Sequence, residues 1–321
     1  MPDFENIIYK ANQQNAEERA KKESSDKPKS QRTDEEKKQY GAEMAEKRKS
    51  CYDMIEQACT DVATSVDAMR TLLDVQSRFD RYSINNNLLI MMQNPEATQL
   101  RVFRDWKKVG GYVVDNPDKI LMLEPKPYKD KETGKTRTGY NIKEAIDISD
   151  VKNVQPRYRM TYTDYGENAM IAAVLDKCPV PVERTEQNLG DTPAVFSEKD
   201  RKIYYNRCSD FPKIFTALAQ ARAHVEMQKS VKDYRVPDHE FHAKCAANII
   251  AAKYGIDTQS VEIFSVPSRF SELEAEEVKK ELDKFHQGAR DVSSVMRGFF
   301  EKEKEKTAKE ATKSDVERED R

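Results

Sequence analysis

The sequence has no hydrophobic run long enough to cross a membrane. A spanning helix needs about 18 or more consecutive apolar residues, and no stretch of the 321 residues meets that requirement. The first ten residues, MPDFENIIYK, also lack the apolar core of a secretory signal. We therefore expect a cytoplasmic protein without a membrane partner.

Cysteine is scarce, and its spacing excludes two common classes of small domain. The chain has five cysteines, an odd number, and no two of them form a CxxC pair. A disulfide framework or a zinc knuckle needs regular pairs. We expect buried free thiols at all five positions: Cys51, Cys59, Cys178, Cys208 and Cys245.

The chain also lacks a net positive charge. It has 55 basic and 57 acidic residues, a formal charge of −2, which excludes a uniformly basic coat for nucleic acid. One segment differs: from Arg78 to Lys143 there are 13 basic and eight acidic residues, and the same segment contains the only tryptophan, Trp106. Any binding of nucleic acid is therefore expected from a local patch in this segment.

Length and charge distribution predict two domains with charged tails. A chain of this length buries a sizeable core and most naturally forms two domains. Charged residues make up 35% of the chain, a high share that predicts some extended segments. We predict a disordered charged tail (1–39), a first domain (40–155), a linker (156–168), a second domain (169–300) and a charged tail (301–321) that passes from frayed helix into disorder.

Local signals predict the elements of the first domain. Apolar side chains recur every three or four residues between Met54 and Leu73, which predicts an amphipathic helix with a break near Thr64-Ser65. A second helix should open at Asn85 and stop at Asn94-Pro95, because a residue before proline is pushed away from helical angles. Gly110-Gly111 should turn the chain into a strand, and a hairpin tip is expected between strands at 119–123 and 140–148.

Basic and aromatic residues alternate just after the second helix. Single-stranded nucleic acid requires cations for its phosphates and flat faces for its unpaired bases, and this segment offers both. The alternative is that the rings belong to the core while the cations lie on a solvated helix face. The side chains concerned are Arg101, Phe103, Arg104, Trp106, Lys107 and Lys108.

Several ordered motifs resemble the N-terminal domain of ArdC-type antirestriction proteins and their LtrC-like relatives on conjugative elements. They are YSINNNLLI (82–90), QNPEAT (93–98), Trp106 with GYV (111–113), ILMLEP (120–125) and AIDIS (145–149). The resemblance implies an α+β protein of two domains, in which a module that binds single-stranded DNA precedes a zincin-like metallopeptidase domain.

The resemblance and the basic patch together predict the DNA-binding residues. Phosphates would be neutralised by basic side chains, bases would stack on rings, and two asparagines would either hydrogen-bond base edges or hold their loop. The cations are Arg101, Arg104, Lys107, Lys108 and Lys126; the rings are Tyr82, Trp106 and Tyr112; the asparagines are Asn85 and Asn86.

The pattern after residue 168 predicts helices and short strands in the order expected of a zincin-like domain. Helical spacing also continues at 257–264 and at 271–300, and Gly255 suits the end of a helix. The other helices are expected at 169–178, 211–228 and 238–254, and the strands near 180–182, 194–196 and 202–205.

The zincin motif itself is degenerate. In an HExxH helix, two histidines hold zinc and the glutamate activates the metal-bound water. The resemblance places this motif on Gln220-Ala221-Arg222-Ala223-His224, so only His224 remains. On the next helix Glu240 matches a family glutamate, and Lys244 stands where another is expected. Glutamine is a poor zinc ligand and alanine cannot act as a base. We predict a pseudo-enzyme without a cofactor.

We therefore predict a protein of a mobile or conjugative element that binds single-stranded DNA without enzymatic activity. Its predicted role is in antirestriction or DNA transfer. Two alternatives stay open. One is a metal-dependent peptidase with a displaced zinc site made from His224, His239, Glu240 and His242. The other is a protein-interaction adaptor whose DNA module has decayed. Nothing in the sequence names a protein partner.

Overall fold

The structure is a computed structural model that describes the backbone of residues 33–130 and 132–319, and side chains through residue 307. It is an α+β fold, with helices as the main elements and three small sheets. The predicted tail at 1–39 lies mostly outside the described residues. Its last part is not a tail, because helix α2 (Asp34–Thr64) begins there, with Thr33 and Glu36 hydrogen-bonded to each other's backbone N–H groups at its start.

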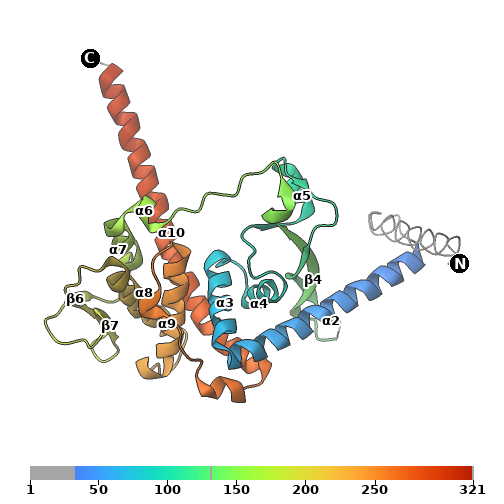
Figure 1. Cartoon of the computed structure of the whole chain (residues 1–321), viewed down its shortest axis with the longest axis horizontal. Coiled ribbons are helices and arrows are strands. Elements are labelled where there is room, and N and C mark those ends of the chain that lie inside the picture. Colours follow the sequence, from blue (N-terminus) through green and yellow to red (C-terminus); the bar gives the residue numbers. More distant parts are fainter. Residues whose placement is uncertain (1–32, 131, 320–321) are drawn as a thin grey trace, which may run out of the picture. The chain divides into compact units, whose positions relative to one another are not determined.

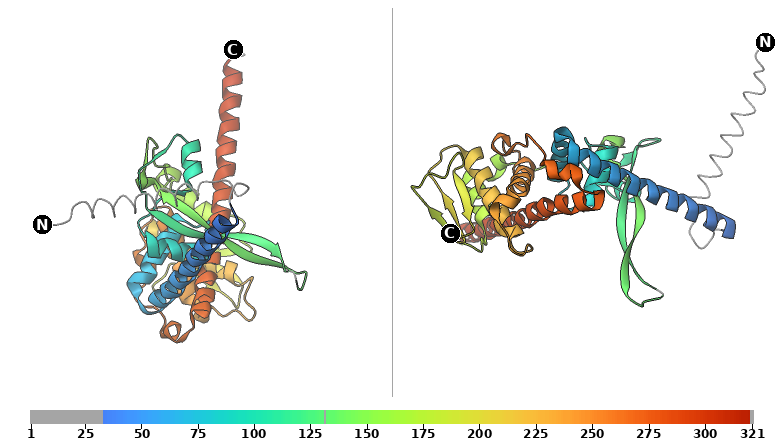
Figure 2. Two further views of the ribbon diagram at one scale, coloured as in Figure 1. Left: turned by 90° about the vertical axis from the view of Figure 1, so that its right-hand side faces the viewer. Right: turned by 90° about the horizontal axis from the view of Figure 1, so that it is seen from below.

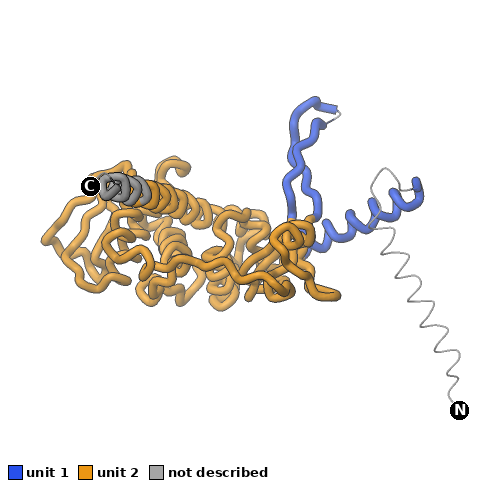
Figure 3. The backbone as a smooth tube through the Cα atoms, turned by 90° about the horizontal axis from the view of Figure 1, so that it is seen from above, with its two compact units in different colours: residues 1–53, 123–142 blue, residues 54–122, 143–321 orange. Residues whose placement is uncertain are grey.

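The chain packs into two compact units (Figure 3). Unit 1 contains the chain up to Asp53 together with Leu123–Ile142, and unit 2 contains Met54–Met122 together with everything from Lys143 onward. This division reflects packing alone and does not test the predicted domains. The linker predicted at residues 156–168 stays a prediction.

Unit 1 combines the first part of α2 with the outer part of a long hairpin. The hairpin is made of β3 (Lys119–Lys129) and β4 (Thr136–Asp147), and it appears as an extended two-stranded ribbon in Figure 2. The hairpin is confirmed, with longer strands than predicted. At its tip, the Asp130 carboxylate accepts hydrogen bonds from the backbone N–H groups of Glu132 and Thr133, a usual way for aspartate to hold a turn.

The first helices of unit 2 follow the signals in the sequence. The break at Thr64-Ser65 is confirmed, because Ser65 caps α3 (Val66–Arg78) by accepting from the backbone N–H of Ala68. Helix α4 (Ile84–Gln93) ends before Asn94-Pro95 as predicted, but its N-cap is Ser83. The asparagines predicted to open this helix therefore lie inside it.

Short strands surround the segment that contains the tryptophan. Strand β1 (Leu100–Arg101) pairs antiparallel with β4, and β2 (Tyr112–Val113) pairs antiparallel with β5 (Val151–Lys152). Helix α5 (Phe103–Lys108) lies between β1 and β2 in the chain, and η2 (Ile148–Asp150) precedes β5. Trp106 packs in a small core with Val113, Ile146, Ile148 and Val151.

The rest of unit 2 follows the predicted order of helices and strands (Figure 1). Helices α6 (Tyr162–Tyr165) and α7 (Glu167–Leu175) precede a sheet of order β6-β8-β7, in which β6 is parallel and β7 antiparallel to β8. Helices α8 and α9 pack against each other and against α10. Their bounds are β6 (Val182–Arg184), β7 (Ala194–Ser197), β8 (Lys202–Tyr205), α8 (Phe211–Met227), α9 (Val236–Lys253) and α10 (Ala275–Glu319).

The prediction of helix at 257–264 is wrong. Only two short 3-10 turns, η3 (Gln259–Val261) and η4 (Ser268–Glu272), lie between α9 and α10. The Asp257 carboxylate accepts from the backbone N–H of Gln259, a local bond that competes with helix formation. Helix α10 then continues through the charged segment to Glu319. Among the described residues, no helix is both long and apolar enough to cross a membrane.

Candidate nucleic-acid interface and the α8–α9 helix pair

Helix α5 and strand β2 present an exposed surface of rings and cations. Phe103 is 49% exposed and Tyr112 is 55% exposed. The ammonium of Lys107 lies 4.6 Å from the centroid of the Phe103 ring, and Arg104 is exposed on the same short helix. We call Phe103, Arg104, Lys107 and Tyr112 the α5–β2 surface. The predicted set of DNA-binding residues did not include Phe103.

Lys108 is less available than its neighbours. Its ammonium lies 2.8 Å from the Asp105 carboxylate, in an exposed ion pair. This hydrogen bond lowers the pKa of the Asp105 carboxyl from its ordinary value. Because exposed pairs of this kind are weak, a phosphate can compete for Lys108 at little cost.

Trp106 has a different role from the one predicted. Its side chain is fully buried, and its indole N–H donates to the backbone carbonyl of Ile146 at 2.9 Å. Arg101 lies over the ring, 5.2 Å from the centroid. A Cβ at Gly111 would lie 3.0 Å from the Trp106 carbonyl oxygen and 2.8 Å from Val151, so glycine is needed for this packing. The folded conformation offers no face of Trp106 to a base, and the core interpretation holds for this residue.

The predicted residues near α4 are also largely packed inside unit 2. Asn86 is buried, so its side chain belongs to the core and not to a base-reading surface. Asn85 is half-buried, and its carbonyl oxygen has no hydrogen-bond partner in the described part of the chain. Tyr82 is half-buried and stacks on Phe79 with ring centroids 5.6 Å apart. Lys126 is exposed on β3 in unit 1.

Helices α8 and α9 bring the degenerate zincin positions together. The Gln220 amide donates to Oε1 of Glu240 at 2.5 Å, and Nε2 of His224 lies 3.1 Å from Oε2 of the same carboxylate. The other imidazole nitrogen, Nδ1, lies 2.6 Å from the hydroxyl of Tyr234. The tautomer of His224 that donates from Nε2 and accepts at Nδ1 satisfies both of its partners, Glu240 and Tyr234. We call these four side chains the Glu240 network.

The electrostatics of the Glu240 network follow from these bonds. The hydrogen bond from His224 holds the pKa of the Glu240 carboxyl below its ordinary value, so the carboxylate stays ionised. Burial raises the pKa of the Tyr234 hydroxyl, which therefore keeps its proton as a donor. The network is a closed set of matched donors and acceptors, in which both carboxylate oxygens are engaged.

The remaining positions of the degenerate motif are structural. Ala221 is buried and has no group that can take up a proton. Arg222 is also buried, pairs with Glu226 at 2.8 Å and donates to the backbone carbonyls of Asp176 and Lys177. Arg222 therefore does not make the site cationic. Lys244 borders a pocket of about 250 Å³ together with Gln220 and Glu240.

The residues proposed for a displaced zinc site fall into two groups. His224 and Glu240 belong to the Glu240 network, whereas His239 and His242 do not. His242 is fully buried, and its Nε2 lies 3.0 Å from the Glu281 carboxylate on α10. His239 stacks on Tyr234 with ring centroids 4.4 Å apart. Burial lowers the pKa of both histidines, and the bond with His242 lowers the pKa of Glu281 to about 2. In the described part of the chain, no three His, Cys, Asp or Glu side chains are placed to hold one metal ion.

These observations do not fit the zinc of a metallopeptidase. At the positions that the resemblance assigns to the motif there is one histidine and no carboxylate base, and the Glu240 carboxylate is bonded to Gln220 and His224. His239 and His242 are both buried. Their pairing with Tyr234 and Glu281 depends on tertiary contacts that spacing does not reveal.

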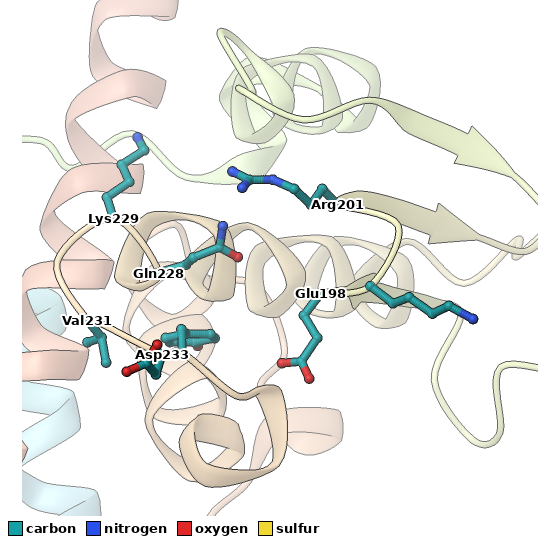
Figure 4. Close-up of a pocket in the computed structure, with 8 residues that line it drawn as sticks. Glu198, Arg201, Gln228, Lys229, Val231 and Asp233 are labelled. Atoms are coloured by element: carbon teal, nitrogen blue, oxygen red, sulfur yellow. The ribbon is translucent and has the colours of Figure 1, made fainter.

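Tyr234 also lines a second pocket, of about 530 Å³, which is shown in Figure 4. Its charged side chains are of both signs, and two of them already have partners in the protein. Glu198 accepts from the backbone N–H of Val236 at 2.7 Å, and Lys229 pairs with Glu226. The labelled lining residues are Glu198, Arg201, Gln228, Lys229, Val231 and Asp233.

The comparisons with known proteins concern the structure alone. No protein-family model matches the sequence, and the search of curated proteins found no match. Two solved structures of the antirestriction protein ArdC from plasmid R388 are similar. The metal-free structure has 14% identity and a TM-score of 0.45 over 68% of this chain and 85% of that one. The Mn(II)-bound structure has 13% identity and a TM-score of 0.49 over 76% of this chain and 97% of that one. Both structures are of an ArdC protein, the type that the motifs of this sequence resemble.

Proposed function

We propose that this chain is a single-stranded-DNA-binding protein of a mobile or conjugative element that acts in antirestriction or DNA transfer without enzymatic activity. The observation that carries the proposal is the α5–β2 surface, where the exposed Phe103 ring lies beside Lys107 and a second exposed ring, Tyr112, is on β2. Unpaired bases stack on such rings whatever their sequence, and the cations neutralise phosphates.

The arrangement of Phe103 and Lys107 supports this use of the surface. Their contact places a cation directly beside an exposed aromatic ring. About half of the Phe103 side chain is still accessible, which leaves ring area for a base. A phosphate is attracted to Lys107 while the base covers apolar ring surface, so each contact helps to position the other.

Revised residue roles follow from the burial of the predicted set. Phe103 and Tyr112 stack on bases, and Arg104, Lys107 and Lys108 contact phosphates. Arg101 and Trp106 support the surface from within, and Tyr82, Asn85 and Asn86 are not part of it. The motifs at 82–98 and 111–125 that resemble ArdC-type proteins support the role in antirestriction.

The α8–α9 helix pair is, in this proposal, a peptidase-like scaffold without catalysis. Hydrolysis by the zincin mechanism needs a base at the position of Ala221 and a second ligand at the position of Gln220. Gln220 instead donates to Glu240, and this bond stabilises the packing of the two helices. The observed contacts do not support a catalytic role for this site.

The experiment is binding of a fluorescent single-stranded oligonucleotide by the purified chain, measured by anisotropy between about 50 and 200 mM salt. Unlabelled duplex DNA and single-stranded RNA serve as competitors. We expect preference for single strands and weaker binding at higher salt. Absence of binding at the lowest salt would refute the proposal and favour the adaptor alternative.

A matched pair of variants tests whether the α5–β2 surface is the part of the chain that binds DNA. Phe103→Ala removes a ring beside Lys107, and Phe264→Ala removes another exposed phenylalanine of unit 2 that also lies beside a lysine, Lys244. We expect Phe103→Ala to weaken binding by about 1–3 kcal/mol, the usual value for one stacked base. Equal affinities of the two variants would contradict the residue assignment.

A further inference from the structure

Unit 1 contains a groove between helix α2 and the β3–β4 hairpin, with a volume of about 430 Å³. The parts of both elements that line the groove belong to the unit coloured blue in Figure 3. The groove is lined by two cations, three tyrosines and three small or polar residues, and no carboxylate lines it. The residues are Arg48 and Tyr52 from α2, and Lys126, Tyr128, Thr138, Gly139, Tyr140 and Asn141 from the hairpin. We call it the α2–hairpin groove.

Arg48 is held in place at the groove by the hairpin. Its Nε donates to the backbone carbonyl of Tyr140 at 3.0 Å. Among the described residues it has no other hydrogen bond and no acidic partner, so the two terminal nitrogens of its guanidinium are left to bind a ligand. A guanidinium presents paired N–H groups that match the oxygens of a phosphate. Lys126, exposed and also without an acidic partner in the described chain, supplies a second positive charge.

Tyr128 is positioned by the glycine opposite it. A Cβ built at Gly139 would lie 3.3 Å from Cε1 and 3.4 Å from Cδ1 of the Tyr128 ring. The ring therefore lies on bare backbone, where a larger side chain would push it away. It is still 48% exposed, and Tyr52 on α2 is 44% exposed. The groove thus offers aromatic surface at a fixed place beside its cations.

We propose that the α2–hairpin groove binds a segment of single-stranded nucleic acid, with a phosphate at Arg48 and Lys126 and a base on Tyr128 or Tyr52. The inference rests on the proposed function and deepens it, because it gives the same ligand a second binding region in a different unit. The tyrosines decide the ligand class. A simple anion or an acidic peptide is satisfied by cations alone, whereas a nucleotide needs cations and flat neutral rings together.

The test uses the full chain and thymidine oligonucleotides, with three variants. Arg48→Ala with Lys126→Ala removes the cations, Tyr128→Ala removes a ring, and Lys49→Ala is the control, since Lys49 is exposed on α2 next to Arg48 but does not line the groove. Thermal unfolding establishes that each variant is folded. Anisotropy across a salt series gives the affinity and the slope of log K against log salt.

We expect the two kinds of variant to differ in their signature. Loss of two phosphate contacts should reduce the slope for single strands by about 1.4, from about 0.7 per contact. Tyr128→Ala should weaken binding about tenfold or more without change in the slope. Ultraviolet crosslinking to an iodouridine oligonucleotide, followed by mass spectrometry, should label Tyr128 or Tyr52.

Two negative outcomes are distinct. If the wild-type chain binds no single strand, the proposed function and this inference both fail. If the wild-type chain binds and Phe103→Ala weakens binding, while the groove variants behave as Lys49→Ala does and neither tyrosine is crosslinked, only the groove proposal is overturned.

Discussion

His224 on α8 and Glu240 on α9 are joined by a bond of 3.1 Å between Nε2 and the carboxylate. The His224 side chain is almost fully buried, whereas about half of the Glu240 side chain is exposed. Glu240 therefore keeps contact with solvent while it satisfies a donor inside the protein. In a zincin these two residue types would share a metal, whereas here they bind each other directly.

Loss of the Glu240 carboxylate should destabilise the fold. Glu240→Ala leaves a buried imidazole N–H without its partner, and we expect a loss of about 1–3 kcal/mol in the free energy of unfolding. Glu240→Gln keeps an acceptor oxygen and should cost less. Urea unfolding followed by circular dichroism measures both. Equal stability of Glu240→Ala and wild type would show that the network does not stabilise the helix pair.

Gln220→His should create affinity for zinc. It would place a second imidazole beside His224 and Glu240, which completes a set of two nitrogens and one carboxylate. Zinc at about 100 times its dissociation constant should then stabilise the variant by about 2.7 kcal/mol. Thermal unfolding with and without zinc measures this, together with elemental analysis after dialysis. We expect no such shift for wild type, and a stoichiometric zinc content in wild type would restore the enzyme alternative.

Trp106 should report on the core and not on DNA. Trp106→Ala is expected to cost about 3–5 kcal/mol, as large-to-small changes in a core do, whereas Trp106→Phe should retain DNA affinity. Because Trp106 is the only tryptophan and is buried, its emission should be blue-shifted and poorly quenched by acrylamide. Strong quenching of the wild-type emission on addition of single-stranded DNA would instead support direct stacking.

Acid should destabilise the protein in two stages. Burial lowers the pKa of His239, His242 and His286 in the folded state. Below about pH 6.5 the unfolded chain therefore binds more protons than the folded chain, and the free energy of unfolding decreases as the pH is lowered. The pKa of Glu281 is lowered to about 2, so its contribution is lost between its ordinary pKa of 4.5 and about 2. Urea unfolding at a series of pH values measures this.

The variant His286→Gln tests the histidine contribution to the loss of stability at acid pH. The ring of His286 lies between the Gln76 side chain and the backbone carbonyl of Tyr82, with no acidic partner among the described residues. His286→Gln should be less stable than wild type at neutral pH and should lose less stability between about pH 7 and 5. A variant with the full acid dependence of wild type would contradict this assignment.

Local chemistry in the sequence was sufficient to predict most elements. Serine at a helix start, asparagine before proline, and a glycine pair before a strand act within a few residues, and the structure has the expected boundaries at Ser65, at Asn94 and after Gly111. The assignment of a degenerate zincin motif rests on residue types alone and stays a prediction.

Only the tertiary structure decided which side chains face solvent and which partners meet. Phe103 and Trp106 are three residues apart on a helix of six residues, too short for periodicity to show which of them is buried. Glycine at 111 and the carbonyl of Ile146, distant in sequence, select Trp106 for the core and leave Phe103 outside. In the same way, the groove of unit 1 exists because Arg48 and Tyr140, 92 positions apart, meet, and sequence spacing carries no information on such contacts.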